Sequence, residues 1–199
     1  YWNLFHPDNL FKFKYANNAE CMTWELITSK MYFYKSICEI GCFNGRVTLI
    51  LKDFLKDKTY IGYDLNIIAI IIAKIINYIF NNSKNNFYFS NGINSSIKDC
   101  ELFVSVATFI YFTELELKNF IHSLKINKSF KCLVTHEFFL NEDFFNNNNS
   151  KEEGNLYVHS ISMIKKSFGK NFSIKTIRTF YSNWENKERI SAILIIKRI

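Results

Sequence analysis

Several features that would assign this 199-residue chain to a familiar class are missing. Its five cysteines form no Cys-x-x-Cys pair and no Cys/His spacing typical of zinc, so we expect no metal site. The most apolar run, 67–80, contains Lys74 and Asn77 and is shorter than the roughly 20 residues of a membrane span. No secretory signal is visible either. These absences predict a cytoplasmic protein without a membrane span, although the first residue is Tyr1 and not Met, which weakens the inference on targeting.

Proline is nearly absent, with one residue, and basic residues outnumber acidic ones to give a net charge of +7. That charge favours approach to polyanions such as nucleic acid. The densest charged groups, at 52–58 and 187–189, mix bases with acids, which is typical of solvated surfaces. A nucleic-acid partner is therefore not favoured. The odd number of cysteines, which lie in apolar segments, indicates free thiols in a reducing compartment.

The most informative segment is Cys38-Glu39-Ile40-Gly41-Cys42-Phe43-Asn44-Gly45, which Asp64 follows at the end of the next apolar run. The pattern predicts a strand, a tight turn, a helix and a second strand, half of a nucleotide-binding βαβ unit. A dinucleotide fingerprint would read G-x-G-x-x-G, but Phe43 occupies the place of its second glycine. The sequence E-x-G-x-x-x-G instead resembles the first motif of class I methyltransferases that use S-adenosylmethionine.

Periodicity and turn residues predict the remaining elements. Strands are expected at 36–41, 59–63, 87–89, 101–107, 130–139, 173–181 and 189–197. Helices are expected at 17–31, 47–55 and 66–80, after a capping box at Thr113 and Glu116, and at 156–168 before Gly169. Residues 141–155 form an asparagine-rich stretch without periodicity, and we expect a loop there.

This order gives five β/α units followed by an antiparallel hairpin. Doubly wound dehydrogenases usually continue with another parallel unit, so the hairpin favours the methyltransferase pattern. We therefore expect an α/β fold, a three-layer Rossmann-like sandwich with a mostly parallel seven-stranded sheet. The chain fits a single domain, with an N-terminal aromatic and helical cap at 1–35 and a core at 36–199.

The resemblance implies S-adenosylmethionine as cofactor and S-adenosylhomocysteine as product. It implies that Glu39 orients the methionine end, that Asp64 accepts from the ribose hydroxyls and that Asn91 stands where the family often has an acid near the adenine. The full set of implied cofactor-binding residues is Glu39, Gly41, Cys42, Gly45, Asp64, Leu65, Asn91, Gly92 and Ser105. Each also has an ordinary structural interpretation: glycines occur in turns without ligands, Asp64 could cap a helix, and Asn91 could be a turn residue.

The acceptor side is less specific. Thr108 and Tyr111 follow the fourth strand, where the resemblance places a motif that borders the acceptor. His136 and Glu137 end the fifth strand and are the candidate general bases, with a hydrogen-bonded structural histidine as the alternative for His136. No Asn-Pro-Pro-Tyr-like tetrapeptide and no Pro-Cys dipeptide occurs, which lowers nucleic-acid methylation as a hypothesis.

The leading hypothesis is an S-adenosylmethionine-dependent methyltransferase that acts on a small molecule or biosynthetic intermediate, with the N-terminal segment and the 141–155 loop closing the site. Two alternatives stay open. One is a non-catalytic RNA- or protein-binding module on the same fold. The other, less favoured, is a nicotinamide-dependent oxidoreductase.

Overall fold

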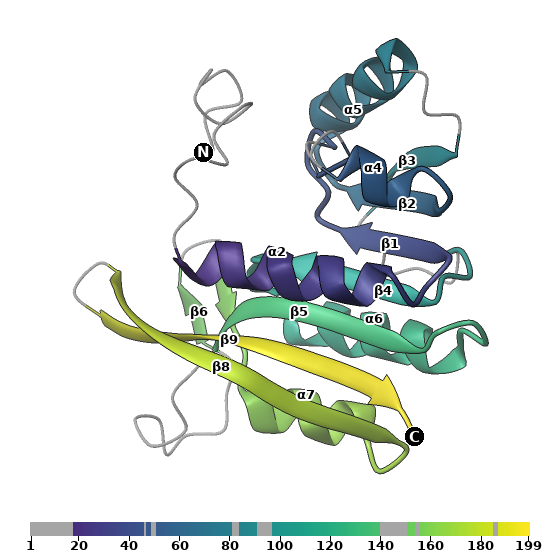
Figure 1. Cartoon of the computed structure of the whole chain (residues 1–199). Coiled ribbons are helices and arrows are strands. Elements are labelled where there is room, and N and C mark those ends of the chain that lie inside the picture. Colours follow the sequence, from purple (N-terminus) through teal and green to yellow (C-terminus); the bar gives the residue numbers. More distant parts are fainter. Residues whose placement is uncertain are drawn as a thin grey trace.

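The computed structural model describes residues 18–45, 47–48, 51–80, 84–90, 97–139, 151–153, 156–184 and 187–199 (Figure 1). Seven strands form the main sheet: β1 (Ser36–Ile40), β2 (Thr59–Asp64), β3 (Asn85–Phe89), β4 (Leu102–Val106), β5 (Cys132–Phe139), β8 (Phe172–Trp184) and β9 (Lys187–Arg198). Two short strands, β6 (Lys151–Glu153) and β7 (Leu156–Val158), pair with each other. The helices are α2 (Asn18–Met31), α4 (Lys52–Leu55), α5 (Ile67–Ile79), the 3-10 helix η2 (Phe109–Tyr111), α6 (Glu114–Ile126) and α7 (Ile161–Phe168).

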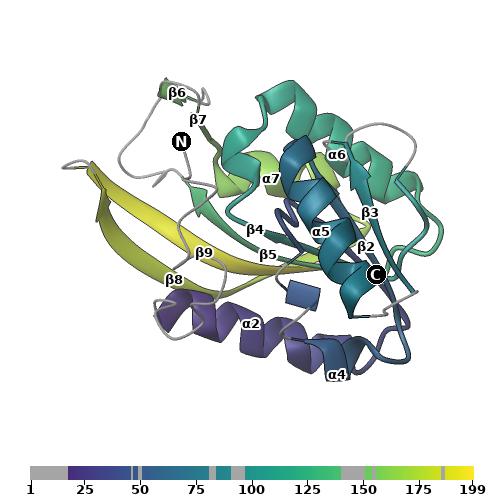
Figure 2. The same cartoon turned by 90° about the horizontal axis from the view of Figure 1, so that it is seen from above.

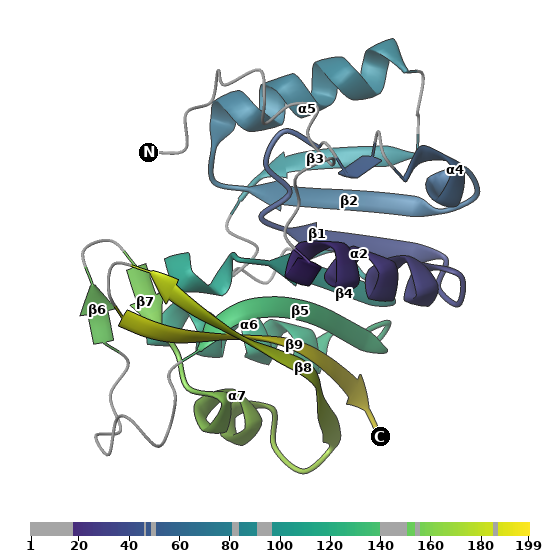
Figure 3. The ribbon, with the colours of Figure 1, turned by 60° about the vertical axis from the view of Figure 1, so that its left-hand side comes forward.

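The sheet has the order β3-β2-β1-β4-β5-β9-β8, which Figure 3 shows from β3 to β5 as a stack. The first five strands in this order run parallel, whereas β9 runs antiparallel to both β5 and β8. The predicted sheet with its C-terminal antiparallel hairpin is confirmed. Strand order reverses between β1 and β4, and in open α/β sheets ligands bind outside the carboxyl ends of the strands at such a point.

Helices cover both faces of the sheet, and Figure 2 shows α2 and α4 on the side opposite α6 and α7. Strand alternation divides the core accordingly. On one face, Ile37 of β1 packs with α2, α4 and α5. On the other face, Cys38 and Ile40 of the same strand pack with η2, α6 and α7. The result is the expected three-layer sandwich.

The isoleucine-rich segment near residue 70 is a helix, as its length and position predicted. Asn66 begins it, because its side-chain oxygen accepts from the amides of Ile68 and Ala69 at 3.1 and 3.0 Å. One face, with Ala69, Ile70 and Ala73, is buried against the sheet. The opposite face keeps its isoleucines about half exposed. Within the described ranges, no helix combines the length and apolar character needed to cross a membrane.

Both helix-end predictions are confirmed. The Thr113 hydroxyl accepts from the Glu116 amide at 3.2 Å, and the Glu116 carboxylate accepts from the Thr113 amide at 2.8 Å, which completes the capping box before α6. Gly169 ends α7 with φ of +78°, a value that favours glycine.

The prediction of one helix over 156–168 is wrong at its start. Residues 156–158 form β7, and α7 begins only after Ser160, whose hydroxyl accepts from the Met163 amide at 3.1 Å. Between them, His159 is 1% exposed, and its side chain binds two backbone carbonyls of another segment. This tertiary contact overrides the helical pattern.

Other differences concern element ends. Residues 151–153 form β6 where we expected only loop, and β3 begins at Asn85, two residues before its predicted start. The helix expected at 47–55 is described as helical at Val47 and Thr48 and again in α4. The aromatic leader at 1–17, most of the 141–155 loop, and residues Asn91 and Gly92 lie outside the described residues.

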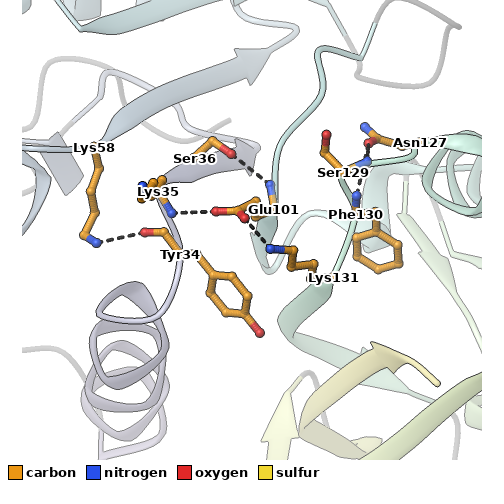
Figure 4. Close-up of polar contacts among 9 residues, drawn as sticks. All are labelled: Tyr34, Lys35, Ser36, Lys58, Glu101, Asn127, Ser129, Phe130 and Lys131. Carbon is orange, nitrogen blue, oxygen red and sulfur yellow. Dashed lines mark hydrogen bonds and ion pairs between the residues drawn. The ribbon is translucent and has the colours of Figure 1, made fainter.

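A polar group joins the amino ends of three strands, at the edge away from the ligand-binding ends. Figure 4 shows the Glu101 carboxylate between Lys35, whose backbone amide donates to it at 2.7 Å, and the Lys131 ammonium. The Glu101 amide donates to the Ser36 hydroxyl at 3.0 Å, and Lys58 donates to the Tyr34 carbonyl at 2.8 Å. The hydrogen bond from Lys131 is the main cause that lowers the pKa of Glu101.

We expect Glu101→Gln to lower the free energy of unfolding at pH 7 by about 1 kcal/mol or less, since partly exposed ion pairs contribute little. A carboxyl whose pKa is lower in the folded state stabilises above its unfolded pKa and loses this effect as pH falls through the folded value. Urea unfolding at pH 7 and pH 3 measures both. A wild-type advantage that grows on acidification would contradict this assignment.

Candidate active site

The carboxyl ends of the central strands lie in register. Ile40 of β1 pairs with Tyr63 of β2 and with Ser105 of β4, and Ser105 pairs with Thr135 of β5. The segments that follow these strands therefore meet at one edge. This brings together four of the sequence-predicted groups: the glycine turn, Asp64, the segment after β4, and the end of β5.

The turn after β1 contains three residues with positive φ, Gly41 (+77°), Phe43 (+47°) and Gly45 (+71°). A Cβ at Gly41 would lie 2.2 Å from the Thr108 hydroxyl oxygen, so glycine is required there by both conformation and space. The amides of Gly41 and Cys42 donate to the Tyr63 carbonyl at 2.8 and 3.1 Å. The turn is thus held against the end of β2.

Asp64 completes this attachment. Its Oδ2 accepts from the Phe43 amide at 2.8 Å, and its Oδ1 accepts from the Asn66 amide at 2.8 Å. Burial raises the pKa of Asp64, and these backbone hydrogen bonds act in the opposite direction. A carboxylate offers about four acceptor positions, and the amides of Phe43, Asn66 and Leu65 do not use all of them. Asp64 is therefore placed against the glycine turn with capacity for further donors.

Apolar side chains follow Asp64 directly. Leu65, Ile67 and Ile68 are each between 51% and 57% exposed. An exposed apolar surface beside a carboxylate with spare acceptor capacity suits a ligand that has a ribose next to a flat base. Leu65, the next residue after Asp64, is part of this exposed apolar surface.

Glu39 lies beneath the turn and is 5% exposed. Its carboxylate accepts a hydrogen bond from the Tyr60 hydroxyl, and burial raises the pKa of that tyrosine well above its ordinary value. The argument that a buried acid requires hydrogen-bonding partners is supported at Glu39. Cys42 is also buried, and it fills the space above Gly62, where a Cβ would lie 2.6 Å from its sulfur.

Ser105 points into a second polar cluster, centred on the fully buried Glu137. Glu137 Oε1 accepts from the hydroxyls of Ser105 at 2.6 Å and Thr135 at 3.0 Å. Its Oε2 accepts from the amides of Thr108 at 2.8 Å and Phe109 at 3.0 Å. Burial raises the pKa of Glu137 to about 7, against the effect of these hydrogen bonds. Because it is fully buried among these four donors, this carboxylate is engaged inside the protein and is not exposed to a substrate.

His136 faces the other side of β5, since neighbouring residues of a strand alternate. It is buried, its Nε2 lies 3.1 Å from the Ser191 hydroxyl oxygen, and its ring centroid lies 5.7 Å from that of Phe180. Burial lowers the pKa of His136 to about 4, so the imidazole is neutral at pH 7. His136 and Glu137, the two candidate bases, therefore lie on opposite faces of β5 with separate partners.

Tyr111, which lies in η2, is 45% exposed.

The sequence analysis assigned no role to Gly62 or to the contacts of His159, and it named Glu137 only as a candidate base. Gly62 interrupts a strand, a signal of close backbone approach that was available. The acceptor role of Glu137 follows from the same argument as that of Glu39, because a carboxylate in an apolar strand requires donors. His159 had no local signal, since its partners are distant backbone carbonyls. No group of three or more potential metal ligands occurs among the residues with described positions.

No family model and no curated protein sequence matches the chain. Solved structures do. The magnesium protoporphyrin IX methyltransferase of Synechocystis PCC 6803, with bound S-adenosylmethionine, has a TM-score of 0.63 and 14% identity, over 96% of this chain and 89% of that chain. The YcgJ protein of Bacillus subtilis has a TM-score of 0.69 and 12% identity, over 90% and 99%.

The N-terminal domain of EvdMO1, with bound S-adenosylhomocysteine, has a TM-score of 0.69 and 9% identity, over 92% of this chain and 82% of that chain. At these identities the likeness establishes the fold, and function has to be argued from the site. The fold is that of the class I, Rossmann-like methyltransferases, as the resemblance of the glycine motif predicted.

The buried carboxyl gives a test of the cluster at β5. Between pH 4.5 and about 7, folded Glu137 retains a proton that the unfolded chain has released, so its contribution to stability is lost as pH rises through this window. Glu137→Gln cannot titrate but keeps an acceptor for the two amides. The quantity compared is the free energy of unfolding of wild type minus that of Glu137→Gln, measured at each pH. We expect this difference to fall by about 3 kcal/mol as the pH rises from about 4.5 to about 7.5. Urea titrations measure it, and a pH-independent difference would contradict the burial of this carboxyl.

Proposed function

We propose that the chain is an S-adenosylmethionine-dependent methyltransferase that acts on a small molecule or biosynthetic intermediate. The observation that carries the proposal is the attachment of Asp64 to the glycine turn through the Phe43 amide, at the point where strand order reverses. Structures of this fold with bound S-adenosylmethionine or S-adenosylhomocysteine support it.

The described residues fit this cofactor. Asp64 offers acceptor positions for the two ribose hydroxyls, and Leu65 and Ile68 offer apolar surface for the adenine. Glu39, beneath the turn, is proposed to orient the methionine end. Gly41, Cys42, Gly45 and Ser105 shape the turn and its surroundings, and Asn91 and Gly92 are proposed at the adenine end.

When bound, the cofactor would supply an electrophilic methyl group on a sulfonium, and S-adenosylhomocysteine would be the leaving group as the acceptor takes that methyl group. The protein's tasks are then to position the acceptor and to exclude water. Tyr111, exposed after β4, is proposed to contact the acceptor. His136, with a pKa of about 4, is a weak base at pH 7, and Glu137 is fully engaged. We therefore infer that positioning, more than general-base catalysis, drives the reaction.

A cytoplasmic location and a small-molecule partner belong to the same proposal. The four cysteines whose burial is described are free thiols, in keeping with a reducing compartment. The antiparallel β8–β9 hairpin and the missing central glycine both oppose a nicotinamide-dependent oxidoreductase.

A non-catalytic RNA- or protein-binding module is the second candidate. It is favoured by the hydrogen bonds that engage both candidate bases and by the net charge of +7. RNA binding that weakens steeply with salt, without production of S-adenosylhomocysteine from S-adenosylmethionine, would support this candidate over the methyltransferase.

Calorimetry with S-adenosylhomocysteine tests the proposed cofactor. We expect wild type to bind and Asp64→Ala to bind at least about tenfold more weakly, a loss of about 1.4 kcal/mol, because both ribose hydroxyls lose their acceptor. Glu101→Gln, at the opposite edge of the sheet, is the control and should bind like wild type.

The 2′-deoxy analogue of S-adenosylhomocysteine separates ribose recognition from loosening of the turn. Wild type should bind the analogue more weakly than the parent ligand, whereas Asp64→Ala should not distinguish the two. A folded wild-type sample that binds neither ligand would sink the proposal.

A further inference from the structure

The segment after β4 is held at both ends by buried titratable side chains. At its start, Glu137 Oε2 accepts from the consecutive amides of Thr108 and Phe109, at 2.8 and 3.0 Å. These are amides that open η2 and have no partner within so short a helix. The Glu137 side chain thus fixes the direction in which the chain leaves β4.

At the other end, His159 Nε2 lies 3.0 Å from the Phe109 carbonyl oxygen and 2.9 Å from that of Phe112. Carbonyl oxygens only accept, so Nε2 carries the proton and donates to both. Nδ1 is buried without a hydrogen-bond partner among the residues that the structure describes, so a second proton there would be unsatisfied and the neutral ring is favoured. His159 is 1% exposed, so its contacts are internal to the protein.

The held segment reaches the glycine turn through Thr108. The Thr108 hydroxyl lies 3.1 Å from the carbonyl oxygens of Ile40 and Val106, and it occupies the space where a Cβ of Gly41 would be. Ala107, just before it, has φ of +52°, a conformation that costs a non-glycine residue free energy and persists only where neighbours enforce it. A shift of Thr108 would therefore change the packing beneath the turn.

We propose that Glu137 and His159 are positioning residues that together fix η2, and that through it they set Thr108 against Gly41 and Tyr111 at the carboxyl edge of the sheet. This inference rests on the proposed function, because it assigns cofactor and acceptor binding to that edge. Neither residue touches a ligand, since both are buried. They act through the backbone of 108–112.

The test compares two uncharged substitutions at Glu137, of which only one keeps a strong acceptor for the two amides. Glu137→Met removes the acceptor for the two amides, whereas Glu137→Gln keeps a carbonyl oxygen for them and turns its NH₂ toward the hydroxyls of Ser105 and Thr135. Thr135→Val is the matched control, because it removes a hydrogen bond to the same carboxyl without involving η2.

We expect Glu137→Met to weaken S-adenosylhomocysteine binding by calorimetry about tenfold, the size of one lost hydrogen bond. Glu137→Gln and Thr135→Val should bind within about twofold of wild type, although Thr135→Val unfolds at lower urea. Amide hydrogen exchange adds a local readout: Thr108 and Phe109 should exchange at least about tenfold faster in Glu137→Met and stay protected in the other two variants.

His159→Leu provides the second variant if Glu137→Met fails to fold. It should weaken binding in the same direction, and His159→Gln, whose amide can donate to the carbonyls, should restore part of it. A folded Glu137→Met or His159→Leu protein that binds like wild type would overturn the inference, as would equal losses in Glu137→Gln and Glu137→Met. If wild type itself does not bind, the proposed function fails, and the exchange rates alone decide whether Glu137 holds η2.

Discussion

The Asp64 carboxylate accepts from the Phe43 amide, and the arrangement of the carboxyl edge depends on this hydrogen bond. The turn after β1 contains residues in the left-handed region, which a free peptide would not maintain. The Tyr63 carbonyl and the Asp64 carboxylate together accept from three amides of that turn, Gly41, Cys42 and Phe43. These hydrogen bonds attach the turn to the end of a parallel strand, and the Asp64 carboxylate beside it still has acceptor capacity.

A second carboxylate supports the turn from the other side. Glu137 holds the backbone that carries Thr108, and Thr108 fills the space against Gly41. The two acids have opposite surroundings, since Asp64 lies partly exposed at the edge while Glu137 is fully buried beneath four donors. This difference separates their roles: one is suited to contact a ligand, and the other is suited to fix the frame.

Local chemistry predicted much of the fold. The cap at Thr113, the glycine after α7 and the acid that ends β2 were all readable, because each belongs to a sequence pattern only a few residues long. The start of α7 was not, since His159 is held by carbonyls of a segment 47 and 50 residues away. Likewise, the sequence offered His136 and Glu137 as candidate bases at one strand end, whereas strand alternation places them on opposite faces with separate partners. At the site, the motif predicted the turn and Asp64 but not what supports them.

In the proposed function, the glycine turn and Asp64 bind the ribose of the cofactor. A crystal structure of the protein soaked with S-adenosylhomocysteine tests this most directly. We expect both ribose hydroxyls within about 3 Å of the Asp64 carboxylate oxygens, with the Phe43 amide still donating to Oδ2. Ligand density elsewhere on the molecule, or a ribose turned away from Asp64, would contradict it.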